Sequence, residues 1–144
     1  MPAPISAMLR EALHIEDDPA VMDIQKSDPP RRFTVGRDQA LTLTDCAHIA
    51  LDPDEQVTFT TPAGGEVDVC RKDWGFYATP SLNGRLPAHG LKPALCANAG
   101  GQLYLLLVET GQEAAFEAYL RDEEMRAIAW LDAPDAAERL TLAD

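Results

Sequence analysis

The sequence predicts an α+β fold, built on a mostly antiparallel β-sheet or a small open barrel or sandwich of about six to eight strands. One helix is expected at the N-terminus and another near the C-terminus. Two observations lead to this fold class. Apolar residues recur with helical spacing close to both ends of the chain, whereas the middle alternates apolar and polar residues with the period of strands. Turn-forming residues separate these alternating runs.

The length and composition indicate one globular domain. The chain has 144 residues, of which 46% are hydrophobic and 25% are charged. These values are ordinary for a domain with its own core. We therefore expect a single domain over residues 1–144, which divides into an N-terminal helix (1–15), a β-rich core (32–108), a helix (110–124) and a loose tail (133–144).

The N-terminal helix is predicted from an apolar stripe with steps of three and four residues. Pro4 suits its first turn, and Pro19 ends any helix that continues through the acidic residues before it. Residues 16–31 are rich in Asp and Pro, and we interpret them as a surface connection. The stripe consists of Ile5, Met8, Leu9, Ala12 and Leu13.

Strands are predicted where the apolar residues recur with a period of two. The four residues 62–65 between two of these runs are Pro-Ala-Gly-Gly, which favours a hairpin loop. A further strand is expected at 74–79. The alternating runs are 41–44, 57–61 and 66–70.

A second hairpin is predicted from 95–98 through the turn 99–101 into Leu103–Val108. The last of these segments has no alternation, which indicates a central strand covered on both faces. The pattern Thr110-Gly-Gln-Glu113 then fits a capping box at the start of the helix 110–124. Residues 127–131 predict a final strand, and an extension of the helix is the alternative.

The charge of the chain excludes several classes of partner. The formal net charge is −12, which opposes unaided binding to nucleic acid or to anionic membranes. The longest strongly apolar run, Leu103–Val108, is too short to cross a bilayer. The N-terminus does not have the order of charge and apolar residues that a secretory signal needs. The three cysteines are odd in number and irregularly spaced, so they do not predict a set of disulfide bonds. We therefore expect a cytoplasmic protein.

One segment departs from this acidic composition. Residues 69–108 contain a single acid, Asp73, and four bases, which gives the segment a net charge of +3. A locally basic surface on an acidic protein attracts anions to one place. We therefore look for a site here, with the bases Arg71, Lys72, Arg85 and Lys92.

The loop 79–92 is the candidate site, because loops of this length inside a small domain are more often functional than idle. Asn83-Gly84 favours a turn with exposed backbone N–H groups, and Arg85 adds a fork that fits carboxylate or phosphate. His89 and Asp73 are the candidates for proton transfer. The competing interpretation places the aromatic residues of this segment in the core. The candidate ligand-binding residues are Arg71, Lys72, Trp74, Tyr77, Ser81, Asn83, Arg85, His89 and Lys92, with Phe76 as a further aromatic wall.

The sequence predicts no metal and no cofactor. Cys46 and His48 are two residues apart and could lie on one face of a strand, but the spacing typical of zinc ligands is missing. Nothing in the sequence brings Cys70 or Cys96 to His89 as a nucleophile pair. Nucleotide-binding glycine motifs and the serine hydrolase motif are also missing.

We therefore expect a small cytoplasmic accessory or binding protein that recognises a partner protein or an anionic small molecule through the loop 79–92. The alternative is a small enzyme that acts on a phosphorylated or carboxylated metabolite, such as a sugar derivative. A homodimer is also expected, formed either through an uncovered edge of the sheet at Leu103–Val108 or through the apolar group Ile128, Trp130 and Leu131.

Overall fold

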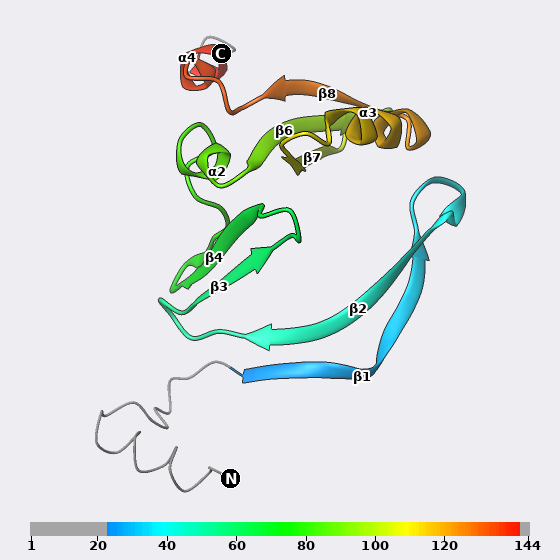
Figure 1. Cartoon of the computed structure of the whole chain (residues 1–144), viewed down its shortest axis with the longest axis vertical. Coiled ribbons are helices and arrows are strands. Elements are labelled where there is room, and N and C mark those ends of the chain that lie inside the picture. Colours follow the sequence, from blue (N-terminus) through cyan, green and yellow to red (C-terminus); the bar gives the residue numbers. More distant parts are fainter. Residues whose placement is uncertain (1–22, 142–144) are drawn as a thin grey trace, which may run out of the picture.

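A computed structural model describes residues 23–141, in which the strands form three small antiparallel β-sheets; the third lies above the second in Figure 1, and the first runs beside the second. The first sheet pairs β1 with β2, the second has the order β3-β4-β5, and the third has the order β7-β6-β8. The N-terminal helix expected over 1–15 lies outside the described residues. The strands are β1 Asp23–Val35, β2 Leu41–Ala50, β3 Gln56–Thr60, β4 Glu66–Lys72, β5 Gly75–Tyr77, β6 Leu91–Asn98, β7 Leu103–Glu109 and β8 Met125–Trp130.

The expected α+β fold with one main sheet, barrel or sandwich is wrong. The described residues are mostly β, and the strands belong to three separate sheets of two or three strands each. The first α-helix in this part of the chain begins only at Arg85. Alternation along a strand indicates one apolar face, but it does not specify which other strand completes the sheet. Contacts between residues far apart in the sequence decide which strands pair, and here they produce three separate sheets.

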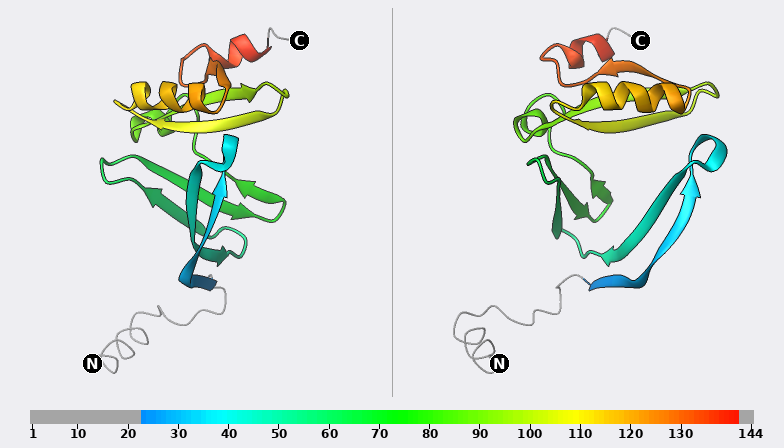
Figure 2. Two further views of the ribbon diagram at one scale, coloured as in Figure 1. Left: turned by 90° about the vertical axis from the view of Figure 1, so that its right-hand side faces the viewer. Right: turned by 45° about the vertical axis from the view of Figure 1, so that its right-hand side comes forward.

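Strands β1 and β2 form a long hairpin, which we call the arm (Asp23–Ala50). It curves past the second sheet, and its tip comes close to the third sheet, as Figure 1 and Figure 2 show. The interpretation of 16–31 as a connection is wrong from Asp23 onward, because β1 begins there. The Asp-Pro-Pro sequence that suggested a loop falls in the irregularity between Lys26 and Arg31, where the ladder shifts register.

The arm has an apolar face with little cover. Cross-strand partners share a face, and Phe33 lies opposite Leu43 while Ile24 lies opposite Ile49. Leu43 remains 45% exposed and Ile24 49% exposed. The apolar side chains of the arm are therefore arranged as in a normal amphipathic hairpin, and residues 23–141 place no complete second layer over them.

The tip of the arm touches the end of helix α3 (Glu113–Asp122). The backbone N–H of Arg37 donates to Oε1 of Glu123 at 2.8 Å, and its Nε donates to the carbonyl of Asp122 at 3.1 Å. The last carbonyls of a helix lack partners within the helix and attract cations. At Gly36, φ is +85° and a Cβ would lie 2.9 Å from the Glu123 carboxylate, so the contact requires glycine.

The second sheet contains the first predicted hairpin. Strands β3 and β4 pair as expected, and the N–H of Thr61 donates to the carbonyl of Gly65 across the turn. The strand predicted at 74–79 is shorter, because β5 covers only Gly75–Tyr77. The chain then leaves the sheet and forms the short helix α2, Arg85–Ala88.

The third sheet holds the main core. Helix α3 covers one face of β6, β7 and β8, and the buried residues Ala94, Cys96, Val108 and Leu120 meet there. Phe116 packs edge-on against Trp130 at 5.6 Å. The predicted hairpin of β6 and β7 and the final strand β8 are confirmed.

The expectation of a central, fully covered strand at Leu103–Val108 is wrong. Strand β7 lies at the edge of its sheet, beyond β6. Leu103 is 62% exposed and Leu105 is 42% exposed. A continuous apolar run shows that both faces of a strand are apolar, but burial depends on which layers the rest of the chain supplies.

Two details near the C-terminus also differ from the expectation. Helix α3 lies within the predicted range 110–124, but its N-cap is Gln112, and the Thr110 hydroxyl donates to the Gly90 carbonyl instead of capping the helix. The expected loose tail is partly helical, because α4 covers Ala136–Thr141 and Ala136 is buried.

Candidate functional site

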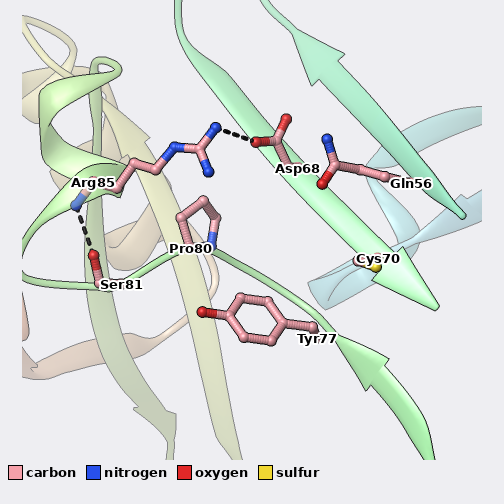
Figure 3. Close-up of a pocket in the computed structure, with 7 residues that line it drawn as sticks. All are labelled: Gln56, Asp68, Cys70, Tyr77, Pro80, Ser81 and Arg85. Carbon is pink, nitrogen blue, oxygen red and sulfur yellow. Dashed lines mark hydrogen bonds and ion pairs between the residues drawn. The ribbon is translucent and has the colours of Figure 1, made fainter. Parts of the chain in front are cut away.

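A small pocket lies where the loop after β5 passes over the second sheet (Figure 3). Its volume is about 160 Å³. It is lined by Gln56, Asp68, Cys70, Tyr77, Pro80, Ser81 and Arg85. Three of the nine residues predicted from the sequence to bind a ligand, Tyr77, Ser81 and Arg85, therefore meet in one place.

The register of the second sheet explains its share of the pocket. Cys70 lies opposite both Gln56 on β3 and Tyr77 on β5, so these three side chains share a face. Asp68 lies two residues before Cys70 and therefore points to the same face. The alternation of β4 therefore places both Asp68 and Cys70 in the lining of the pocket.

The loop supplies the other wall and is well anchored. Leu86 is fully buried, and Pro80 is buried beside the pocket. The Ser81 hydroxyl accepts a hydrogen bond from the backbone N–H of Arg85 at 2.7 Å, which fixes the start of α2. At Gly84, a Cβ would lie only 2.7 Å from the Ser81 Oγ, so a larger residue would disturb this contact. These contacts anchor the loop as one wall of the pocket.

Arg85 is paired with an acid of the neighbouring strand. Its Nη2 donates to Oδ2 of Asp68 at 2.9 Å, and the Thr58 hydroxyl donates to the other oxygen, Oδ1, at 2.6 Å. The Asp68 side chain is 12% exposed, whereas the Arg85 side chain is 59% exposed. The two formal charges cancel, so the pocket is close to neutral at pH 7 and still offers further N–H donors of Arg85 to solvent.

Two other bases of the segment 69–108 also have carboxylate partners. Nζ of Lys92 lies 3.3 Å from Glu113 and 5.0 Å from the centre of the Trp130 ring. Lys72 pairs with Asp54, and its hydrogen bond and Coulomb attraction to that carboxylate raise the pKa of Lys72. These bases therefore do not converge with Arg85 on one basic surface.

Arg71 is turned toward the base of the arm. Its Nη1 donates to the carbonyl of Leu51 at 2.7 Å, and its Nε donates to the carbonyl of Lys72. Arg71 lies opposite Phe76 and one residue from Cys70, so it points to the face of the sheet away from the pocket. It connects the second sheet to the arm and does not line the pocket.

The two candidates for proton transfer are also outside the pocket. His89 lies near the turn between β3 and β4, where its Nδ1 is 3.8 Å from Glu66. It lines a separate hollow of about 340 Å³ with Gly64, Gly65 and Glu109. Asp73 is exposed in the turn between β4 and β5. Neither residue belongs to the lining of the pocket.

The aromatic residues after β4 are on the surface. Trp74 is 73% exposed, Phe76 57% and Tyr77 55%. This exposure contradicts the competing interpretation of a buried aromatic cluster. Tyr77 points to the face with the pocket, and Phe76 points to the opposite face of the same strand. Asn83 is exposed in the turn before α2.

The cysteines and His48 stay apart. Cys46 is exposed on the arm, Cys70 lines the pocket, and Cys96 is buried in the third sheet, where burial raises the pKa of its thiol. His48 contacts Asp45 of its own strand at 3.3 Å. Between residues 23 and 141, no group of three or more His, Cys, Asp or Glu side chains is placed to hold a metal ion.

Sequence reasoning missed Asp68 and Gln56. Both belong to strands whose alternation had been recognised, so the signal was the shared face of the predicted hairpin. The charge count hid Asp68, because the segment 69–108 begins directly after it.

Comparison with known proteins identifies no relative: no protein-family model, no curated protein and no solved structure matches this chain. Within the part that the structure describes, we find no helix with the length and apolar character needed to span a membrane.

Proposed function

We propose that the protein is a small accessory protein that recognises a partner protein through the surface formed by β5 and the loop 79–92. The observation that carries the proposal is the half-exposed Tyr77 beside a small pocket in which Arg85 and Asp68 are paired. Trp and Tyr are the residues that most often dominate the energy of protein–protein interfaces. Trp74 adds a second exposed aromatic side chain in the preceding turn.

The size of the pocket supports a protein partner. Sites for small ligands usually measure about 300–1,000 Å³. The pocket holds about 160 Å³, which suits the insertion of one side chain from a larger binding surface. A partner would gain most of its contact area beside the pocket, on the exposed parts of Tyr77 and of the loop.

The charge of the pocket supports the same choice over a free small anion. The Arg85 charge is compensated by Asp68, and the whole chain carries −12. A free anion would meet no net positive potential there, because long-range attraction needs an uncompensated charge. The remaining donors of Arg85 can still hydrogen-bond an acceptor that other contacts bring into position.

The three described cysteines are free thiols, which supports a reducing compartment. We therefore infer that the partner is a cytoplasmic protein.

Peptide selection tests the proposal. Peptides are selected from a displayed random library on the full chain, and their affinities are measured for the wild type and for Tyr77→Ala. We expect Tyr77→Ala to weaken binding by at least about 2 kcal/mol, as at a typical aromatic hot spot. Phe76→Ala is the matched control, because Phe76 has nearly the same exposure on the opposite face.

The outcome that contradicts the proposal is binding that survives Tyr77→Ala, or that is lost equally in both variants. A thermal-shift screen with phosphate, sugar phosphates, nucleotide sugars and carboxylates tests the small anion. Ligand at one hundred times its dissociation constant would stabilise the fold by about 2.7 kcal/mol. Stabilisation that is sensitive to salt and lost in Arg85→Ala would favour the anion over the protein partner. The alternative of an enzyme has no support in this pocket, because His89 and Asp73 do not line it.

A further inference from the structure

Strand β7 offers an unpaired backbone edge within the described part of the chain. Its only partner there is β6, on one side. The N–H of Asn98 donates to the carbonyl of Gln102, and the N–H of Thr110 donates to the carbonyl of Gly90. Residues of β7 at even positions therefore bond to β6, and those at odd positions direct N–H and C=O groups outward. The outward set is Leu103, Leu105, Leu107 and Glu109.

Over residues 103–108, and within the described residues 23–141, this edge lacks the features that usually protect a strand from pairing. Edge strands are normally blocked by charged side chains, by proline or by a covering segment. Residues 103–108 contain no charge and no proline, and Leu103 is 62% exposed. The uncharged stretch in fact extends over 93–108. In a chain with a net charge of −12, such a strip allows a second copy to approach with little local repulsion.

We propose that β7 pairs with β7 of a second copy of this chain in an antiparallel, two-fold symmetric arrangement. The pairing makes a continuous six-stranded sheet, in which the two β7 strands are the central pair. Outward N–H and C=O groups at every second residue can bond to the same groups of an identical strand that runs in the opposite direction. One surface therefore serves both copies. This surface is separate from the pocket, which belongs to the second sheet.

The side chains select the register. With Leu105 opposite Leu105 of the second copy, Leu103 lies opposite Leu107, and only leucines form the hydrogen-bonded pairs. Centring the pair on Leu106 would place the Glu109 carboxylate against Leu103 and bring a charge into the apolar strip. The register at Leu105 leaves Glu109 beyond the paired segment.

The arrangement also agrees with the position of α3. Leu106 and Val108 point to the α3 side, and the outward-bonding leucines point to the other face. A two-fold axis perpendicular to the sheet keeps the two α3 helices on one face. The leucines at 103, 105 and 107 of both copies then form one continuous apolar strip on the opposite face.

Analytical sedimentation of the full chain tests the pairing. We expect the wild type to form a dimer and Leu105→Lys to sediment as a folded monomer, because two lysines would face each other at the axis. Ile128→Lys is the matched control: Ile128 is 44% exposed on β8, at the other edge of the same sheet. Higher salt should strengthen the wild-type dimer, because it screens the repulsion between two acidic copies.

A second measurement does not depend on how well Leu105→Lys folds. In a chain with Cys46→Ser, oxidation of Leu105→Cys should give a covalent dimer, because directly opposite Cα atoms about 5.5 Å apart allow a disulfide. Ile128→Cys should give much less. A monomeric wild type at its highest soluble concentration overturns the proposal. A dimer that Ile128→Lys disrupts and Leu105→Lys does not would also overturn it. Tyr77→Ala should leave the dimer intact, so failure here is distinct from failure of the proposed function.

Discussion

The arm and the third sheet each contain an antiparallel hairpin with apolar side chains, and they differ in what covers those side chains. In the third sheet, α3 lies over β6, β7 and β8, and Cys96 is fully buried beneath it. In the arm, Leu43 and Ile24 lie on the apolar face of the hairpin and remain about half exposed. The difference in burial therefore follows from α3, which covers the hairpin of the third sheet.

This comparison shows where the stability of the chain is concentrated. A two-stranded hairpin alone is only marginally stable in water. The arm is attached at its base through Arg71 and Leu51, and at its tip through Arg37 and the end of α3. We expect the third sheet to unfold with the molecule as a whole, whereas the arm opens locally at a lower free energy.

The largest expected difference is in thiol reactivity. Cys46 lies exposed on the arm, and Cys96 is buried in the third sheet with a pKa raised by burial. Cys96 reacts only when its sheet opens, so we expect Cys46 to be alkylated at least about 10³ times faster. Peptide mass spectrometry after timed labelling measures both rates. Similar rates would show that the third sheet is as open as the arm.

Truncation of one leucine in each region should give the next largest effect. Leu120→Ala creates a cavity under α3 and should lower the free energy of unfolding by about 2–5 kcal/mol. Leu43→Ala, at an exposed position on the arm, should change it by no more than about 0.5 kcal/mol. Urea unfolding of both variants checks the contrast. A large loss at Leu43 would mean that the apolar face of the arm is covered in solution.

The contact at the tip of the arm should have a smaller effect. Arg37→Ala removes a hydrogen bond to the end of α3 and an ion pair with Glu124, both exposed, and should cost about 1 kcal/mol or less. Its main result should be faster amide hydrogen exchange along the arm with little change in the third sheet. Arg31→Ala is the control, because it removes an ion pair inside the arm and leaves the tip contact in place.

The smallest effect is expected from Glu113, at the start of α3. A hydrogen bond from its own backbone N–H and the contact with Lys92 lower the pKa of its carboxyl below 4.5. A lowered pKa in the folded state contributes stability above the unfolded value, and this is lost as the pH falls through the folded value. Glu113→Gln should therefore be less stable than the wild type at neutral pH, and the difference should disappear on acidification. Melting temperatures across the acid range test this, with Glu117→Gln on the same helix as the charge control.

The local features of the fold were predictable from the sequence. The turn at 62–65 and the turn at 99–101 each join two strands that pair as expected. A hairpin can be predicted from residues close together in the sequence, because its turn needs glycine and its strands show alternation within a few residues. The position of β7 was not predictable in this way, because a run of leucines does not reveal whether another strand lies beside it.

The candidate site was likewise predictable in its local features and not in those that depend on distant residues. The exposed loop and the tyrosine beside it could be found from composition, but the charge balance could not. The segment 69–108 is poor in acids, yet Arg85 pairs with Asp68 and Lys92 pairs with Glu113, both just outside that segment. Counting charges along the chain gave a basic region, whereas pairing in space gives a neutral one.

The sequence by itself determined the two hairpins that turn at 62–65 and 99–101 and the acidic character of this protein, because these depend on neighbouring residues and on totals. Only the tertiary structure decided that the strands form three sheets, that β7 is an edge and that Arg85 is paired. Such properties arise from contacts between residues far apart in the chain, where burial and charge compensation depend on the partner that folding brings near.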